Sequence, residues 1–187
     1  MKLILASNSP RRKDILRSVG FDFKVITSGY DEKGDGDAET LVKTFAYGKA
    51  KSVFDSLTDA EKKQSVVLGA DTVVALNGKI LGKPKDEKAA AEMLKNLSGK
   101  THYVFTGYAI ISDNESIVGL DKTEVTFNRL SDELISEYVA TGSPLDKAGA
   151  YGIQDGFPLV KEYKGSLNNV IGIPIEKIKP IIEKLMK

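Results

Sequence analysis

The stretch from Ser65 to Leu81 reads SVVLGADTVVALNGKIL, and it decides the fold of this chain. Its first part, over 65–76, is mostly apolar, which is typical of a buried strand. An Asn-Gly pair follows at 77–78, and such a pair between two apolar runs is the strongest short-range signal for a β-hairpin, because both residues tolerate the positive φ of a type I′ turn. A two-residue turn pairs Leu76 with Lys79. We therefore predict a long strand over 65–76 that turns back into a short strand at 79–81.

Hydrophobic periodicity on either side of this hairpin predicts an α/β fold. Helical spacing and capping signals predict helices over 10–19, 38–57, 86–97, 131–142 and 174–185. Apolar or alternating runs predict further strands at 3–6, 21–25, 103–111, 117–127, 159–163 and 169–173. No repeat, low-complexity run or linker interrupts the 187 residues, so we expect a single domain, 1–187, with two lobes.

The composition excludes several kinds of chemistry. The chain has 27 Lys and Arg against 26 Asp and Glu, a net charge of +1, so we expect no nucleic-acid partner. With no cysteine and a single histidine, His102, it has no thiolate nucleophile and no cluster of histidine ligands, and we interpret His102 as structural or exposed. The apolar run at 1–6 is too short for a signal peptide or a membrane span, which predicts a cytoplasmic protein without a membrane partner.

The first candidate site is the strand-to-helix junction SNSPRR at 7–12. Ser9 is the expected N-cap and Pro10 the first helical residue, so free backbone N–H groups with partial positive charge lie here. Arg11 and Arg12 in the first turn are unfavourable unless an anion neutralises them, and guanidinium groups bind phosphate oxygens in pairs. The junction therefore predicts a phosphate site, with a pair of solvated surface arginines as the alternative.

The second candidate site lies at the open end of the hairpin. Extending the register from the Asn-Gly turn pairs Thr72 with Lys83, which makes Asp71 and Lys83 neighbours. Asp71 follows an apolar run, so we expect its carboxylate at the rim of a cleft, where a carboxylate binds a cation or activates water. The alternative is a structural Asp–Lys ion pair at a strand end. Lys49 falls on the apolar stripe of the helix at 38–57, and its alternative is a lysine that snorkels to solvent.

The third candidate site is the segment LDKAGAYGIQ at 145–154. Its small residues allow a flat ligand to approach the backbone closely. Gln154 offers both a hydrogen-bond donor and an acceptor, which recognition of a nucleobase edge requires. The alternative is a plain loop rich in turn-forming residues.

Taken together, these segments resemble the Maf family of nucleoside triphosphate pyrophosphatases over nearly the whole chain. The matching blocks are LASNSPRR at 5–12, GADTVV at 69–74, GKP at 82–84, LSG at 97–99, DKAGAYGIQ at 146–154 and GIP at 172–174. The family consists of cytoplasmic hydrolases linked to septum formation and to the house-cleaning of non-standard or excess nucleotides. The resemblance implies an elongated α/β fold, with a mixed sheet flanked by helices, similar to that of the inosine triphosphate pyrophosphatases. It also implies a nucleotide cleft between the two lobes and often a homodimer.

The resemblance further implies a reaction and the residues that perform it. A nucleoside triphosphate is hydrolysed between its α and β phosphates, with a divalent cation such as Mg2+ or Mn2+. By position, Asp71 is implied as the proton acceptor, and Glu32 and Asp71 as the residues that hold the cation. The resemblance implies that phosphate and metal are bound by Ser7, Arg12, Glu32, Lys49 and Lys83, together with the backbone amides around Ser9.

At three more positions of the family, the residue type varies with the preferred substrate. In this chain these residues are Arg11, Thr72 and Gln154. This combination is similar to that of the branch that hydrolyses dTTP and UTP. The residue after Gln154 is Asp155, where relatives usually have glycine, so a charge stands beside the expected base pocket.

Two alternatives stay open at the level of sequence. The cleft could belong to a regulator of cell division that binds nucleotides or nucleic acid without hydrolysing them, although the near-neutral charge disfavours this. The enzyme could also prefer purine or damaged triphosphates. The hypothesis of a triphosphate site requires that the arginine pair at 11–12 and the hairpin end with Asp71 and Lys83 share one pocket.

Overall fold

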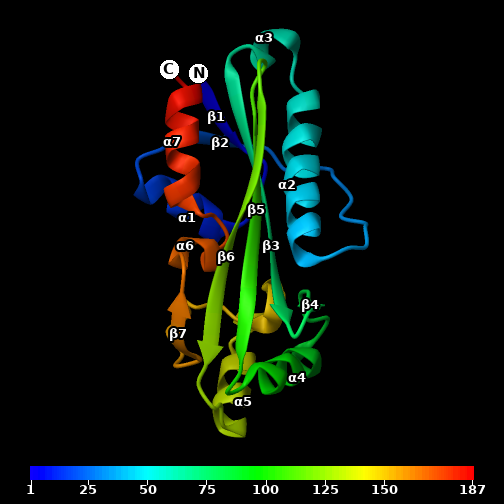
Figure 1. The fold of residues 1–187 in the computed structure, drawn as a ribbon, viewed down its shortest axis with the longest axis vertical. Coiled ribbons are helices and arrows are strands. Elements are labelled where there is room, and N and C mark those ends of the chain that lie inside the picture. Colours follow the sequence, from blue (N-terminus) through cyan, green and yellow to red (C-terminus); the bar gives the residue numbers. More distant parts are fainter.

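The computed structural model describes all 187 residues and contains one seven-stranded mixed sheet. The strand order is β2-β1-β3-β5-β6-β7, and β4 pairs with β3 outside this path. The strands are β1 (Lys2–Leu5), β2 (Phe23–Val25), β3 (Ser65–Leu76), β4 (Lys79–Leu81), β5 (Thr101–Ile111), β6 (Ser116–Phe127) and β7 (Val160–Lys164). Strand β1 runs parallel to β2 and β3, and all other pairs are antiparallel. The predicted mixed α/β sheet is therefore confirmed (Figure 1).

Five of the seven α-helices begin at a side-chain cap, whereas α1 follows Ser9 and α7 follows Pro174 without one. The helices are α1 (Pro10–Ser18), α2 (Ala38–Asp55), α3 (Asp59–Lys62), α4 (Glu87–Leu97), α5 (Asp132–Ala140), α6 (Leu167–Ile171) and α7 (Ile175–Leu185), with 3-10 turns η1 (Ser143–Asp146) and η2 (Ala148–Ala150). Side-chain oxygens of the N-cap residues accept first-turn N–H groups at Asp37, Thr58, Asp86, Ser131 and Ser166. These bonds satisfy donors that a helix start otherwise leaves unpaired. No helix combines the length and the apolar composition that crossing a bilayer requires.

Helices cover both faces of the sheet, and the alternation of side chains along β3 assigns residues to each face. Helix α2 lies on one face, and α1 and α7 lie on the other, near the two termini (Figure 1). Val66 and Leu68 pack in one core cluster with Leu16 of α1 and Ile178 of α7, whereas Val67 packs in another with residues of α2. Successive strand residues point to opposite faces. Odd-numbered residues of β3 therefore face α2, and even-numbered ones face α1 and α7.

A third core cluster lies at the end of the molecule far from the termini. There α4 and α5 pack against the ends of β3, β5 and β6 (Figure 1). Leu94, Phe127, Tyr138 and Leu159 are its largest fully buried side chains together with Leu97. Strand β3 contributes to this cluster through Val74 and so connects both ends of the molecule.

Strand β3 changes its neighbour in the middle of one edge. Its residues 65–68 pair with β1, and its residues 74–76 pair with β4. Because β5 occupies the other edge along 67–75, β1 and β4 must lie on the same edge. The segment 69–73 therefore has a strand neighbour on one side only. The gap contains Asp71 and Thr72.

Two glycines let the backbone of α2 approach the sheet closely. A Cβ atom at Gly69 of β3 would collide with the carbonyl oxygen of Ala46, and one at Gly107 of β5 would collide with that of Val42. Backbone atoms of a helix cannot move aside as the end of a side chain can. These two glycines therefore fix how close α2 lies to β3 and β5.

Two sequence predictions were wrong in detail. The segment 169–173, predicted as a strand, forms α6 and its C-terminal end, because Ser166 caps a helix there and Asn169 is fully buried with its amide donating to Val104 O and Thr123 Oγ1. The predicted pairing of Thr72 with Lys83 is also absent, since the β3–β4 ladder ends at Val74 and Leu81. Beyond that point Gly82 O accepts the N–H of Gly149, which turns the chain away from β3.

Candidate functional site

One cavity of about 430 Å³ lies at the gap in β3 and collects most of the predicted site residues. Those that line it are Ser9, Arg11, Arg12, Glu32, Lys49, Asp71, Thr72, Lys83 and Gln154. Ser7 does not line it and instead accepts hydrogen bonds from Ser9 N and Arg12 Nη1, both at 3.2 Å. The arginine pair and the hairpin end thus share one pocket, as the hypothesis of a triphosphate site requires. Asp71 and Thr72 point to opposite faces of β3 and both line the pocket, at the place where no strand covers this edge of β3.

Asp71 and Glu32 are held by one lysine on the α2 side of the cavity. Asp71 has an odd number, faces α2 and is only 7% exposed. Lys49 of α2 places Nζ 2.7 Å from Asp71 Oδ1 and 2.8 Å from Glu32 Oε1. The partner of Asp71 is therefore Lys49 and not Lys83, which forms no ion pair and no side-chain hydrogen bond. The apolar position of Lys49 in the sequence reflects this bridge rather than snorkelling to solvent.

The two carboxylates also fit a divalent cation in part. Their remaining oxygens, Glu32 Oε2 and Asp71 Oδ2, have no hydrogen-bond partner in the protein, and no third carboxylate or imidazole joins them in a metal-binding group. Mg2+ is usually bound by one or two carboxylates together with waters and substrate phosphates. The donor set therefore fits a cation that enters with a phosphate ligand, and it does not form a complete protein cage.

Arg12 and Thr72 lie on the α1 side of the cavity. Arg12 donates from Nε to Gly172 O at 3.0 Å and from Nη2 to Thr72 Oγ1 at 3.2 Å. Burial lowers the pKa of Arg12 below its ordinary value, and the nearby charge of Arg11 acts in the same direction, whereas Asp71 and Glu32 oppose it. Arginine stays protonated in proteins. With one further bond to Ser7, three of its five N–H groups are used, and two remain for an anion.

The hydroxyl of Thr72 presents an acceptor to the cavity. Thr106 Oγ1 donates to Asn169 O at 2.8 Å, so its only proton is used there. The contact of 2.9 Å between Thr72 Oγ1 and Thr106 Oγ1 must then carry the proton of Thr72. Since this proton points into the protein and Arg12 Nη2 donates to one lone pair, a ligand meets only the other lone pair of Thr72 Oγ1.

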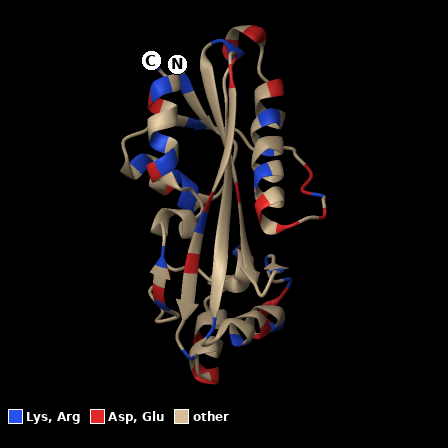
Figure 2. Cartoon of the chain, viewed as in Figure 1, with Lys and Arg blue, Asp and Glu red and all other residues tan.

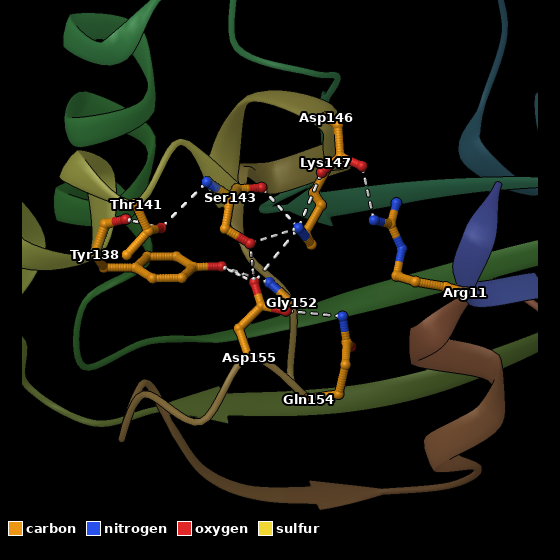
Figure 3. A network of polar contacts seen from close by, with 9 residues as sticks. All are labelled: Arg11, Tyr138, Thr141, Ser143, Asp146, Lys147, Gly152, Gln154 and Asp155. Atoms are coloured by element: carbon orange, nitrogen blue, oxygen red, sulfur yellow. Dashed lines mark hydrogen bonds and ion pairs between the residues drawn. The ribbon is translucent and has the colours of Figure 1, made fainter. Parts of the chain in front are cut away.

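A second polar cluster, formed by the segment after α5, also borders the cavity; Figure 3 shows its side chains. Lys147 is 8% exposed and donates to Ser143 O at 2.6 Å and to Asp146 Oδ1 at 2.9 Å. Asp146 also accepts from Arg11 Nη1 at 2.8 Å, which joins α1 to this segment. Burial acts to raise the pKa of Asp146, but Lys147 and Arg11 outweigh it and hold the pKa below its ordinary value.

Sequence reasoning did not assign a role to Lys147 or Asp146, although both lie in the DKAGAYGIQ block. A lysine beside a Gly-rich segment carries no signal of its own, because only the fold connects it, through Asp146, with Arg11. The apolar wall of the cavity was also missed. It consists of Leu41, Phe45, Val73, Val74, Ile80, Val104, Ala148, Tyr151, Val170 and Ile171.

The charges in the cavity favour an anion. Its lining contains the cations Arg11, Arg12, Lys49, Lys83 and Lys147 and the carboxylates Glu32, Asp71 and Asp146. Elsewhere charges of both signs occur on the same helix, as Figure 2 shows for α2, which has acidic residues near its two ends and lysines between them. His102 does not line the cavity. Its side chain is buried, with Nε2 2.8 Å from Tyr151 Oη, so the interpretation of His102 as structural is consistent with its position.

Comparison with known proteins gives one consistent family. Residues 2–185 match the family described as Maf-like protein. A protein of Clostridium novyi named dTTP/UTP pyrophosphatase is 43% identical over 187 residues, which cover 97% of this chain and 96% of the relative. A protein of Thermosipho africanus with the same name is 47% identical over 184 residues, with coverages of 97% and 92%.

Among solved structures, a nucleoside-triphosphatase named dITP/XTP pyrophosphatase from Mycobacterium abscessus aligns with 100% of this chain and 99% of its own, at 16% identity and a TM-score of 0.48. The Ham1 protein of Staphylococcus aureus aligns with 68% of this chain and 72% of its own, at 17% identity and a TM-score of 0.42.

Proposed function

The chain belongs to the Maf-like protein family, and from this premise we propose that it hydrolyses nucleoside triphosphates to the monophosphate and pyrophosphate, with dTTP and UTP as preferred substrates. Near-full-length relatives named dTTP/UTP pyrophosphatase support the reaction and the substrate class. The observation that carries the proposal is the cavity at the β3 gap, where Asp71 lies among five cationic side chains. A triphosphate brings about four negative charges, and its transfer reactions depend mainly on positioning and charge stabilisation.

The proposed chemistry begins with the grip on the triphosphate. Lys83 has no partner in the protein and supplies a free ammonium, while Arg12 supplies its two unused N–H groups. The N–H groups at the start of α1, near Ser9, add partial positive charge. Together these groups would neutralise the phosphate chain and orient its α-phosphorus towards Asp71.

Asp71 would then act as the general base. It takes a proton from a water molecule whose oxygen forms a bond to the α-phosphorus, while the bond from that phosphorus to the bridging oxygen of the β-phosphate breaks and pyrophosphate leaves. Lys49 keeps Asp71 and Glu32 together against their mutual repulsion and so positions both oxygens. A divalent cation such as Mg2+ or Mn2+, held by Glu32, Asp71 and phosphate oxygens, would supply charge neutralisation and a more acidic water.

The base and sugar end of the substrate would lie against Arg11, Thr72 and Gln154. Thr72 offers an acceptor, as its proton is donated to Thr106, and Gln154 offers an amide. The proposed site comes from one chain, so the reaction needs no partner subunit, and a homodimer stays a prediction. We also propose that the reaction takes place in the cytoplasm, where nucleoside triphosphates are made and used.

The test is a product analysis with a panel of nucleoside triphosphates and Mg2+ or Mn2+. We expect pyrophosphate and monophosphate with dTTP and UTP, and in isotopically labelled water we expect the label in the monophosphate, since water attacks the α-phosphorus. Orthophosphate alone, or label in pyrophosphate, would exclude this mechanism. No product with any nucleotide would support a binding protein instead.

Asp71→Asn is the matched variant, because it keeps the shape of the side chain and removes the base. General-base catalysis typically contributes about 100-fold to 10,000-fold, so kcat is expected to fall by at least about 100-fold. A folded Asp71→Asn protein with wild-type kcat would reject the role of Asp71.

A further inference from the structure

The amide of Gln154 is held in one orientation by its neighbour in the chain. Gln154 Nε2 donates a hydrogen bond to Asp155 Oδ1 at 2.9 Å (Figure 3). A carboxylate oxygen only accepts, so the nitrogen of the amide and not its oxygen must lie against Asp155. Gln154 is otherwise exposed at the cavity wall. Its carbonyl oxygen and second N–H remain for a ligand.

Asp155 is itself fixed in position. Its other oxygen, Oδ2, accepts from Tyr138 Oη at 2.6 Å and from Ser143 Oγ at 2.7 Å, and Lys147 Nζ lies 3.4 Å away. Tyr138 is fully buried and its oxygen accepts the N–H of Gly152 at 2.9 Å. Oδ1 is thereby directed towards Gln154.

Gly152 leaves the space that the contact needs. A Cβ atom there would lie 2.5 Å from Asp155 Oδ1 and 2.7 Å from Gln154 Nε2. The backbone at 152 thus accommodates both side chains only without a side chain of its own. The contact between Gln154 and Asp155 is part of the packing of this segment.

We propose that Asp155 is a positioning residue that prevents a half-turn of the Gln154 amide. It thereby selects uracil and thymine, the bases with an imide N–H, over cytosine. This inference rests on the proposed function and deepens it. A free amide serves two opposite hydrogen-bond patterns, because a half-turn exchanges its oxygen and nitrogen. An amide held by a carboxylate serves only one.

The chemistry of the bases makes this difference selective. The N3–H of uracil or thymine is a donor beside a carbonyl acceptor, which matches an amide that presents its oxygen and an N–H in fixed places. Cytosine in the same pose presents the lone pair of N3 to the amide oxygen and its amino group to the N–H. Two acceptors then face each other in one contact and two donors in the other, so neither contact forms a hydrogen bond. A site built for hydrogen bonding rejects such a ligand.

Asp155→Asn tests the proposal, since asparagine has the same shape but its oxygen stays with the donors at the Oδ2 position. Its NH2 group then faces Gln154 and favours the reversed orientation of that amide. The measurement is the ratio of kcat/KM for UTP to that for CTP, on protein shown to be folded by circular dichroism. One hydrogen bond between uncharged groups corresponds to about 3-fold to 10-fold, and the ratio is expected to fall by that factor through KM, with kcat unchanged. Asp155→Ala, which removes the acceptor, is the second variant and should lower the ratio as well.

Asp113→Asn is the matched control, because it makes the same chemical change at an exposed residue that does not line the cavity. It should leave the ratio unchanged. An unchanged ratio in both Asp155 variants, or an equal fall in Asp113→Asn, would overturn the proposal. Wild-type turnover of UTP separately decides the proposed function, and if it is absent, the same ratio is taken from the dissociation constants of UTP and CTP.

Discussion

Lys49 and Lys83 line the same cavity but differ in their contacts. Lys49 bridges Asp71 and Glu32, and its side chain is 13% exposed. Lys83 is exposed and has no partner, so its ammonium is available to a ligand without the loss of any internal contact. The first lysine is thus part of the structure of the site, and the second is a free charge at the cavity wall, which the proposed function assigns to the substrate.

Lys83→Ala should therefore separate activity from stability. We expect kcat/KM for UTP to fall about 100-fold to 1000-fold, the usual effect of removing one group that stabilises developing charge. The free energy of unfolding in urea should change by less than about 0.5 kcal/mol, as for other surface substitutions. Lys79→Ala, in the exposed turn region of the same hairpin, is the control and should change neither quantity. Equal activities of the two variants would contradict the role of Lys83.

His102 should make stability depend on pH without taking part in catalysis. Burial lowers the pKa of His102 from its ordinary value of 6.5 to about 4. Between these two values the unfolded chain binds a proton that the folded protein does not bind, so the free energy of unfolding falls as the pH falls. The contribution is complete above pH 6.5 and is lost as the pH approaches 4.

Between pH 7 and pH 5 this loss amounts to about 2 kcal/mol for His102 alone. Urea unfolding at both pH values measures it, and His102→Gln provides the comparison because it removes the titrating ring while the carboxylates stay. The variant should lose about 2 kcal/mol less than the wild type over this interval. Equal losses in the two proteins would show that His102 binds its proton in the folded state as well.

At the scale of elements, the position of α2 sets the position of Lys49. The helix lies close to the sheet because Gly69 and Gly107 have no side chains under it. Gly107→Ala introduces a Cβ atom against the backbone of Val42, so α2 must move. We expect a loss of about 1–3 kcal/mol in the free energy of unfolding, as for other overpacked sites.

A displaced α2 also carries Lys49 away from Asp71, so kcat of Gly107→Ala should fall although residue 107 does not line the cavity. Gly29→Ala is the matched control, since nothing lies within 4 Å of a Cβ atom there. Thermal unfolding and initial rates of both variants check the prediction. A Gly107→Ala protein as stable and active as Gly29→Ala would contradict the close approach.

The elements could be predicted where one local signal dominates. Strand β3 and its turn follow from the Asn-Gly pair, and α4 follows from the cap Asp86 and its apolar spacing. The strand predicted at 169–173 was wrong, because its apolar residues fit a helix as well as a strand. The buried amide of Asn169 and the Ser166 cap favour the helix, α6. Local periodicity contains no information on such long-range contacts.

The candidate site could likewise be predicted only where a local signal exists. Asp71 and the arginine pair could be singled out from the local pattern, but the pairing of Asp71 with Lys49 depends on which face of β3 meets α2. Glu32 lies in an irregular acidic segment, and only the family resemblance pointed to it. Lys147 gave no signal because its partners are Ser143 and Asp146 of η1 and Asp155, which only the fold brings around it.

At the scale of the whole molecule, the long strands connect the two ends. The core near the termini contains Leu68 and Ile110, and the core at the far end contains Val74 and Val104. Each pair comes from β3 and β5, which run through both cores without a break. We therefore propose that the two lobes form one domain, 1–187. Neither lobe can unfold alone, because this would break the strands that both lobes share.

This arrangement predicts a single cooperative unfolding transition. The chain has 7 tyrosines and no tryptophan, and Tyr108 reports on the core near the termini while Tyr138 and Tyr151 report on the far core. Urea titrations followed by far-UV circular dichroism and by tyrosine fluorescence should give the same midpoint. Two separate midpoints would show that the lobes unfold independently.

At the gap along one edge of β3, the residues around Asp71 can change in evolution without a change in the pairing of β3. Asp71 is anchored on a central strand, whereas Arg11, Gln154 and Asp155 come from peripheral segments that the strand does not need for its own pairing. Under the proposed function, we expect substitutions in those segments to change the preferred base while the carboxylate of Asp71 stays in register. Diversification of such a pocket thus requires no rebuilding of the scaffold, only new side chains around an unchanged opening.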